Sequence, residues 1–180
     1  MRLVGPLTPG QFAQVQDGSI AGTAAVGFVD IAEGRVLLLR GDGNNVLAET
    51  GTEIFFGDVV ETEAGASIGI TFIDDSTFAL GESGRMVIDE FVYEPAEGIG
   101  QSVFNVLKGV FSFVSGDIAE GSDDAMTVNT PVLSIGVRGT TVAGRAASEG
   151  SENTVTLLPD AGGSVGAIAA VSYTHLRAHE

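Results

Sequence analysis

The sequence contains no cysteine and no tryptophan, and its only lysine is Lys108. Without cysteine the chain can form no disulfide framework, no thiolate nucleophile and no cysteine-ligated zinc site. Basic residues are also scarce, since 8 Lys and Arg stand against 24 Asp and Glu and give a net charge of −16. Because so acidic a chain repels the phosphate backbone, we expect no nucleic acid among its partners.

The chain also lacks long apolar runs and has few histidines. No stretch approaches the run of about 18 apolar residues that a transmembrane helix needs, so no membrane span is expected. The only histidines are His175 and His179. Their H-x-x-x-H spacing suits zinc on a helix, but Leu176 stands where the H-E-x-x-H pattern has its Glu. We therefore expect no metal and no cofactor.

Two short motifs are interpreted as turns rather than as sites. Residues 162–166 match G-x-S-x-G, but no helix-forming segment and no triad partners follow Ser164 as a hydrolase would require. Arg40-Gly41-Asp42 is an integrin-type tripeptide that opens a Gly/Asp/Asn turn between two strands. We expect no enzymatic activity. Carboxylate pairs for glycoside cleavage stay open, because their separation is a three-dimensional quantity.

Acidic residues gather between residues 117 and 124, where Asp117, Glu120, Asp123 and Asp124 could offer oxygen ligands to calcium. The spacing of an EF-hand loop is absent, and so is that of a β-roll repeat. A solvated acidic loop is the favoured interpretation, with calcium as a weaker alternative.

Short apolar runs alternate with clusters of Gly, Asp, Asn and Glu along the chain. The clearest period-two pattern places Ile68, Ile70 and Phe72 on one face, which predicts a hairpin over residues 67–80. Strands are also expected at 36–39, 53–56, 59–62, 85–93, 111–114, 125–129, 132–143, 153–159 and 165–171. This spacing predicts an all-β domain, either an antiparallel sandwich of jelly-roll type or a short β-helical fold.

One segment departs from this pattern. Val103, Phe104, Val106, Leu107, Val110 and Phe111 recur with helical spacing, so we expect one short helix near 100–108 that ends at Gly109. The strand 85–93 is expected to turn Met86 and Ile88 to one face and Phe91 to the other.

The chain is divided by composition into three parts. Residues 1–33 are interpreted as a lead-in or linker, and residues 34–170 as the β domain. Residues 171–180 look foreign to the rest and resemble a translated sequencing-adapter tail found at the ends of metagenomic reading frames. We therefore expect a fragment whose natural sequence continues beyond Val171.

Four short blocks, taken in order, resemble the signature of the FecR-domain family. They are the strand from Gly34 to Arg40, the G-D-x-x-x-T block of Gly57, Asp58 and Thr62, the hairpin 67–80, and a T-P pair followed by an R-G-T turn. The T-P pair is Thr130-Pro131, and the R-G-T turn is Arg138-Gly139-Thr140. One departure is Asp74-Asp75, which stands where the family favours Asp-Gly; Asp tolerates positive φ better than most residues.

The resemblance implies an all-β domain located outside the cytoplasm, with no catalytic role. Our first hypothesis is a non-enzymatic module of a bacterial secreted or surface protein that serves assembly or protein–protein contact. The alternative is a periplasmic signal-relay domain of an iron-responsive transmembrane regulator of a sigma factor. A carbohydrate-binding sandwich is weaker, because such sites usually expose aromatic platforms. The protein partner is not specified by either hypothesis.

Within the signature, Arg138 is flanked by the apolar Val137 and Ile135. We expect it to lie near the core and to pair with Asp58 or a strand-end carbonyl, since a buried cation needs a partner. Pro131 has no N–H and is expected at the start or edge of a strand.

Overall fold

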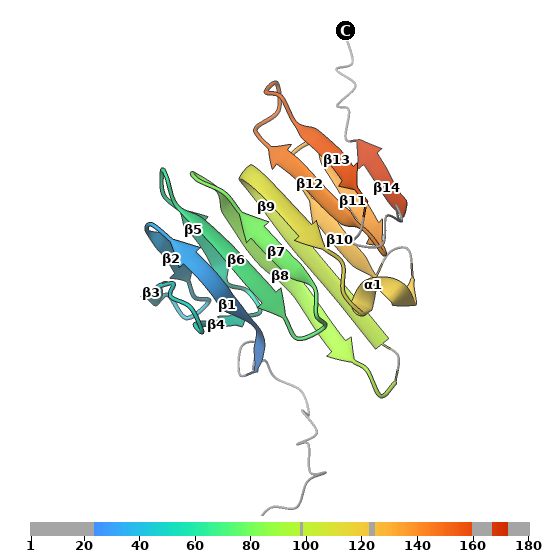
Figure 1. Ribbon diagram of the computed structural model, residues 1–180, viewed down its shortest axis with the longest axis horizontal. Helices are drawn as coiled ribbons and strands as arrows, with labels where there is room; N and C mark the ends of the chain where they lie inside the picture. The colour runs from blue at the N-terminus through green and yellow to red at the C-terminus, as the bar shows by residue number, and fades with distance from the viewer. Residues whose placement is uncertain (1–23, 98, 123–124, 160–166, 173–180) are drawn as a thin grey trace, which may run out of the picture.

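The computed structural model describes residues 24–97, 99–122, 125–159 and 167–172 (Figure 1). Strands account for almost all of the regular structure, which confirms the predicted all-β class. In chain order the elements are β1 (Ala25–Glu33), β2 (Val36–Leu39), β3 (Asn45–Leu47), β4 (Glu53–Phe55), β5 (Val59–Thr62), β6 (Ser67–Phe72), β7 (Thr77–Leu80), β8 (Arg85–Glu94), β9 (Ile99–Val114), α1 (Ile118–Gly121), β10 (Met126–Asn129), β11 (Leu133–Arg138), β12 (Thr141–Ala146), β13 (Thr154–Leu158) and β14 (Ala167–Ser172).

The strands form one curled sheet whose two halves face each other as layers. Layer A has the order β4-β1-β6-β7-β9-β12-β13, and layer B has the order β3-β2-β5-β8-β9-β10-β11-β14. Among the strands of the described residues, every pair is antiparallel except β9 with β10, which is parallel. Figure 1 shows β1, β6, β7, β9 and β12 side by side.

Strand β9 belongs to both layers. Its first half pairs with β8 and β10, and its second half pairs with β7 and β12. The change occurs at Gly109, where φ is +111°. Buried side chains fall on even positions before this glycine, such as Phe104 and Val106, and on odd positions after it, at Phe111 and Phe113.

The helix expected near 100–108 is therefore wrong, because that segment is the first half of β9. The one-residue phase change at Gly109 mixes the two faces of the strand and imitates helical spacing in the sequence. The single helix among the described residues is α1, which follows β9. No helix in the described ranges is long and apolar enough to cross a membrane.

The core lies between the layers and is rich in phenylalanine. Phe72 on β6 stacks on Phe91 of β8 with ring centroids 5.4 Å apart, and it contacts Phe104 of β9 at 4.9 Å. Phe78 on β7 contacts Phe104 at 5.7 Å and Phe113 at 6.0 Å. Phe78 and Phe113 are neighbours within layer A, whereas the other three contacts join strands of opposite layers, so aromatic packing holds the curled sheet closed.

The predicted hairpin 67–80 is confirmed as β6 and β7, with Ile68, Ile70 and Phe72 buried. Met86 and Ile88 of β8 are buried as expected. The placement of Phe91 on the opposite face is wrong, because a register shift between Ile88 and Glu90 returns Phe91 to the inner face.

The sheet is longer at its start than the proposed division of the chain suggests. Residues 25–33, interpreted as part of the lead-in, form β1, which pairs with β4 and β6 and buries Val26 and Val29. At the other end, β14 includes Val171 and Ser172 and pairs with β11.

Candidate functional site

Asp58 is the most deeply buried charged residue of the family signature, with 1% of its surface exposed. Gly57 precedes it with φ at +81°, and this left-handed turn directs the carboxyl group inward. Asp58 Oδ2 accepts hydrogen bonds from the Phe55 N–H at 2.8 Å and from Arg40 Nη1. The Asp58 carboxylate therefore ties the end of β2 to the turn between β4 and β5.

Arg40 makes three separate contacts around this carboxylate. Besides the ion pair with Asp58, its Nη2 donates to the Glu53 carbonyl at 2.8 Å. The guanidinium also lies over the Phe55 ring, 4.7 Å from the centroid, in a cation–π contact. Only 14% of the Arg40 side chain is exposed.

Burial raises the pKa of the Asp58 carboxyl above its ordinary value of 3.8. The Phe55 N–H and the Arg40 guanidinium act against this rise, because both favour the charged form. The net direction upward means that desolvation outweighs the two contacts.

Thr62 ends the G-D-x-x-x-T block and fixes the opposite end of β5. Its Oγ1 donates to the Gly81 carbonyl at 2.6 Å and accepts from the Gly84 N–H at 2.8 Å. The hydroxyl therefore bridges both sides of the β7–β8 turn. The block places one polar anchor before β5 and one at its last residue.

Thr130 and Pro131 form the turn between β10 and β11. The Thr130 N–H donates to the Leu133 carbonyl at 2.8 Å, and Thr130 Oγ1 accepts from the Leu133 N–H at 3.2 Å. Pro131 is exposed in this turn, two residues after the end of β10 and two before the start of β11. It was expected at the start or edge of a strand, and it lies between two strands, where its missing N–H costs no strand-pairing hydrogen bond.

The Arg138-Gly139-Thr140 turn carries the chain from layer B to layer A. Gly139 has φ at +55°, and Thr140 is buried. Thr140 exchanges hydrogen bonds with Ser115 at the end of β9, through its N–H to Ser115 Oγ at 2.9 Å and from the Ser115 N–H to its carbonyl at 3.2 Å. The turn is thereby attached to the strand that also belongs to both layers.

Arg138 does not lie where the sequence suggested. It is exposed at the end of β11, and the ion-pair partner of Asp58 is Arg40. Sequence reasoning missed Arg40, although the signal was present. Arg40 is the cation that ends β2, and it opens a turn in which its N–H and carbonyl bond Asn44 and Gly43.

The eight signature residues therefore do not converge on one site. Gly57, Asp58 and Thr62 frame β5, and the other five form the turns at the two ends of β11. Each buried polar side chain of the signature contacts this chain's own backbone or side chains. The buried polar residues of the signature therefore connect neighbouring strands and turns of the sheet.

Two shallow clefts share Asp117 and Glu120 in their walls, and the smaller of them also adjoins the Gly139-Thr140 turn. The larger, of about 660 Å³, is lined also by Tyr93, Ile99 and Gly100. Tyr93 donates its hydroxyl to Asp117 Oδ2 at 2.8 Å, and this hydrogen bond raises the pKa of the Tyr93 hydroxyl. The nearby charges of Asp117, Asp74 and Asp75 act in the same direction.

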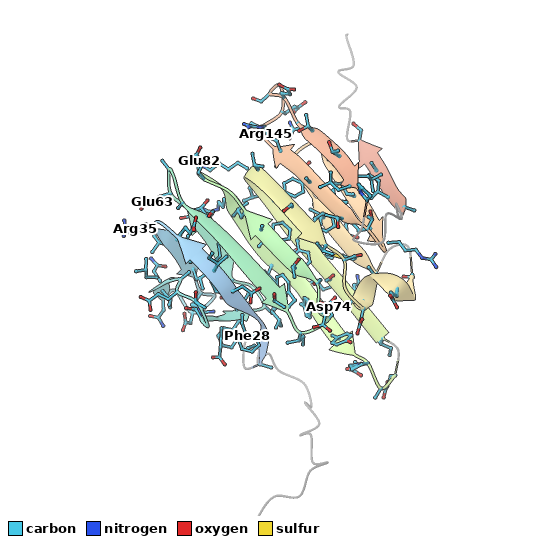
Figure 2. The ribbon with its side chains drawn as sticks, viewed as in Figure 1. Phe28, Arg35, Glu63, Asp74, Glu82 and Arg145 are labelled. Carbon is cyan, nitrogen blue, oxygen red and sulfur yellow. The ribbon has the colours of Figure 1, made fainter. Side chains whose placement is uncertain are left out.

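The turn beneath these clefts tolerates the Asp74-Asp75 departure from the family pattern. Asp75 adopts φ of +62°, and Asp74 Oδ1 accepts from Ser76 Oγ at 2.6 Å. Gly116 packs directly on this turn, since a Cβ there would lie 2.1 Å from the Asp74 carbonyl oxygen. Figure 2 shows Asp74 beside α1.

The calcium alternative gains no support from the described residues, among which no three His, Asp or Glu side chains are placed to hold a metal ion. Asp123 and Asp124 lie outside the described ranges, as do the G-x-S-x-G segment 162–166 and both histidines.

Comparison with known proteins gives a match to one family. The family model described as FecR protein matches residues 58–159, more than half of the 180-residue chain. The match begins at Asp58 and includes Thr62, both turns of β11 and the crossover to β12. No curated protein and no solved structure matches the chain. The chain belongs to the FecR protein family.

Proposed function

We propose that the chain is a non-enzymatic module that makes protein–protein contacts outside the cytoplasm, in the assembly of a bacterial secreted or surface protein. The observation that carries this proposal is the central part of the outer face of layer A, between its edge strands β4 and β13. This face is formed by the outward side chains of β1, β6, β7, β9 and β12, and it is named here the A face.

The A face is arranged in three rows that cross the strands. Paired residues define the rows as Phe28-Thr71-Thr77-Val114-Thr141, Ile31-Gly69-Ala79-Ser112-Ala143 and Glu33-Ser67-Gly81-Val110-Arg145. Four large apolar side chains lie open on it, with exposures of 45% for Phe28, 53% for Ile31, 49% for Val110 and 44% for Val114. In a sheet with one solvated face, the outward positions of each strand usually carry polar or charged side chains. Exposed apolar side chains at these positions therefore indicate a contact surface.

Charge is almost absent from the A face although the chain carries −16. Its rows contain only Glu33 and Arg145, and Asp30 stands at a register shift in β1, where it accepts a hydrogen bond from Thr71 Oγ1. Figure 2 shows Arg35, Glu63, Glu82 and Arg145 along one rim of the molecule, with Phe28 at the opposite end. Depletion of charge at the centre with charge at the rim is the usual anatomy of a protein interface.

Site-specific photo-crosslinking in the native host tests this proposal. A photoreactive residue at Val110 reports from the A face, and one at Leu107 is the matched control. Leu107 lies on the same strand with 43% exposure, but in the half that belongs to layer B. Protein adducts from position 110 and not from position 107 are expected. Adducts from neither position, or equally from both, would contradict a contact role for the A face.

Membership of the FecR family favours a second candidate, the periplasmic signal-relay domain of an iron-responsive regulator. A relay also acts through protein contact, but its partner is a receptor and its readout is transcription. A fusion that places the full chain as the periplasmic part of such a regulator separates the two. A reporter that responds to the iron–siderophore complex supports relay, and a silent reporter beside intact crosslinking supports the assembly module.

A further inference from the structure

The A face is self-complementary about its central strand. Its five strands follow the order β1-β6-β7-β9-β12, so β7 lies in the middle. A two-fold axis along β7, between two A faces, would place β1 of one copy over β12 of the other and β6 over β9. Each row would then meet itself in reversed order.

This reversal sets large residues against small or medium ones. Ile31 would face Ala143 of the other copy, Val110 would face Ser67, and Val114 would face Thr71. Thr77 and Ala79 of β7 and Gly81 just after it are small or medium residues, and they would lie on the axis, where two backbones must approach most closely. Alternation of large and small side chains across facing positions is what allows two sheets to interdigitate.

The same operation pairs the two charged residues of the third row. Glu33 on β1 and Arg145 on β12 end that row at equal distances from β7, and both are exposed. Within one chain four strand spacings separate them, or about 19 Å, so they cannot pair with each other. Across the axis, Glu33 of each copy would meet Arg145 of the other, which gives two ion pairs at the rim.

The size of the A face is sufficient for a specific contact. Five strands at about 4.8 Å spacing and six-residue strands at about 3.4 Å per residue give roughly 24 Å by 20 Å, or about 500 Å² of flat area per copy. Two copies would bury about 1,000 Å² of flat area, which is the lower bound for a biological interface. The side chains that project from the sheet add to this area.

We propose that the A face binds a second copy of this chain, through a two-fold axis that runs along β7. The inference rests on the proposed contact role and names its partner. Because each copy carries −16, long-range repulsion opposes association, and added salt screens that repulsion. The dimer therefore strengthens from low to moderate salt, unlike an association driven by attraction of opposite net charges.

Sedimentation equilibrium of the full chain tests the dimer. Ala79→Lys places like charges together on the axis and is expected to weaken dimerisation at least about tenfold. Leu107→Lys adds the same charge outside the A face and is expected to leave dimerisation unchanged. A wild-type chain that stays monomeric at every salt concentration would overturn the proposal, as would an equal loss from both variants.

A charge exchange tests the geometry of the axis with two exposed positions that leave the core intact. Glu33→Arg and Arg145→Glu are each expected to weaken the dimer, and the double variant is expected to restore it. A double variant weaker than either single variant would overturn the proposed axis. If position 110 crosslinks a different protein while the purified chain remains monomeric, self-association is wrong and the contact role stands.

Discussion

The Asp58–Arg40 pair is the residue-scale contact that we expect to matter most for stability. Asp58 is 1% exposed and Arg40 is the cation that neutralises it. Asp58→Ala leaves Arg40 Nη1 and the Phe55 N–H without their acceptor. Removing one partner of a buried pair costs about 3–5 kcal/mol, and urea unfolding measures this loss.

The exposed pair Arg35–Glu63 provides the matched control. Its N–O distance is 2.8 Å, but 62% and 53% of the two side chains are exposed. Arg35→Ala is expected to cost about 0–1 kcal/mol, because water screens the pair. Equal losses at the exposed and the buried pair would contradict a structural role for the signature aspartate.

The raised pKa of Asp58 predicts a pH dependence of known sign. The folded chain holds the Asp58 proton to a higher pH than the unfolded chain does, whose pKa is near 3.8. The stability that comes from protonation of Asp58 in the folded state is thus fully present below that value and is lost as pH rises through the folded pKa. The difference in stability between wild type and Asp58→Asn should fall over this window. A rise would mean that Arg40 outweighs desolvation.

Residue identity alone did not reveal which arginine serves Asp58. Arg138 has apolar neighbours in sequence, but Arg138 ends β11 and turns outward at the crossover. The cation that reaches Asp58 comes from the β2–β3 turn, and that proximity depends on the pairing of β2 with β5. Which strands pair is a property of the tertiary structure, and the local sequence pattern of either strand does not specify it.

At the scale of elements, β9 determines how the sheet closes. Gly109 has φ at +111°, and a Cβ there would lie 2.7 Å from the Gly84 Cα. Gly109→Ala is therefore both strained and crowded, and we expect a loss of about 1–3 kcal/mol in urea unfolding.

Gly121→Ala is the control for Gly109→Ala, since no heavy atom lies within 4 Å of a Cβ at that position and no positive φ occurs there. It is expected to change stability little. A neutral Gly109→Ala would show that β9 can pass between the layers without a left-handed residue.

Element-scale patterns were readable wherever one face of a strand stays buried throughout. The hairpin 67–80 keeps Ile68, Ile70 and Phe72 on the inner side without interruption, so period two was visible. Strands β8 and β9 each contain a register shift, which moved Phe91 to the inner side and made residues 100–108 resemble a helix. A bulge depends on how a strand pairs with its partner, so the sequence of one strand alone does not predict it.

At the scale of the whole molecule, charge and signature are separated. Within the described ranges, the acidic residues lie largely outside the A face, and the buried signature side chains form their hydrogen bonds within the sheet and its turns. Composition shows that the chain is acidic. Only the strand order shows that the A face carries few charged side chains. We therefore assign stability to the signature residues and association to the A face.

The dependence of the urea unfolding midpoint on protein concentration tests this assignment most directly. If the folded chain associates through the A face, mass action adds stability as concentration rises, up to about 1.4 kcal/mol per tenfold increase. The wild-type midpoint is predicted to rise with concentration, and that of Ala79→Lys to stay constant at the wild-type value found at low concentration. Two constant midpoints, or two that rise together, would contradict the assignment.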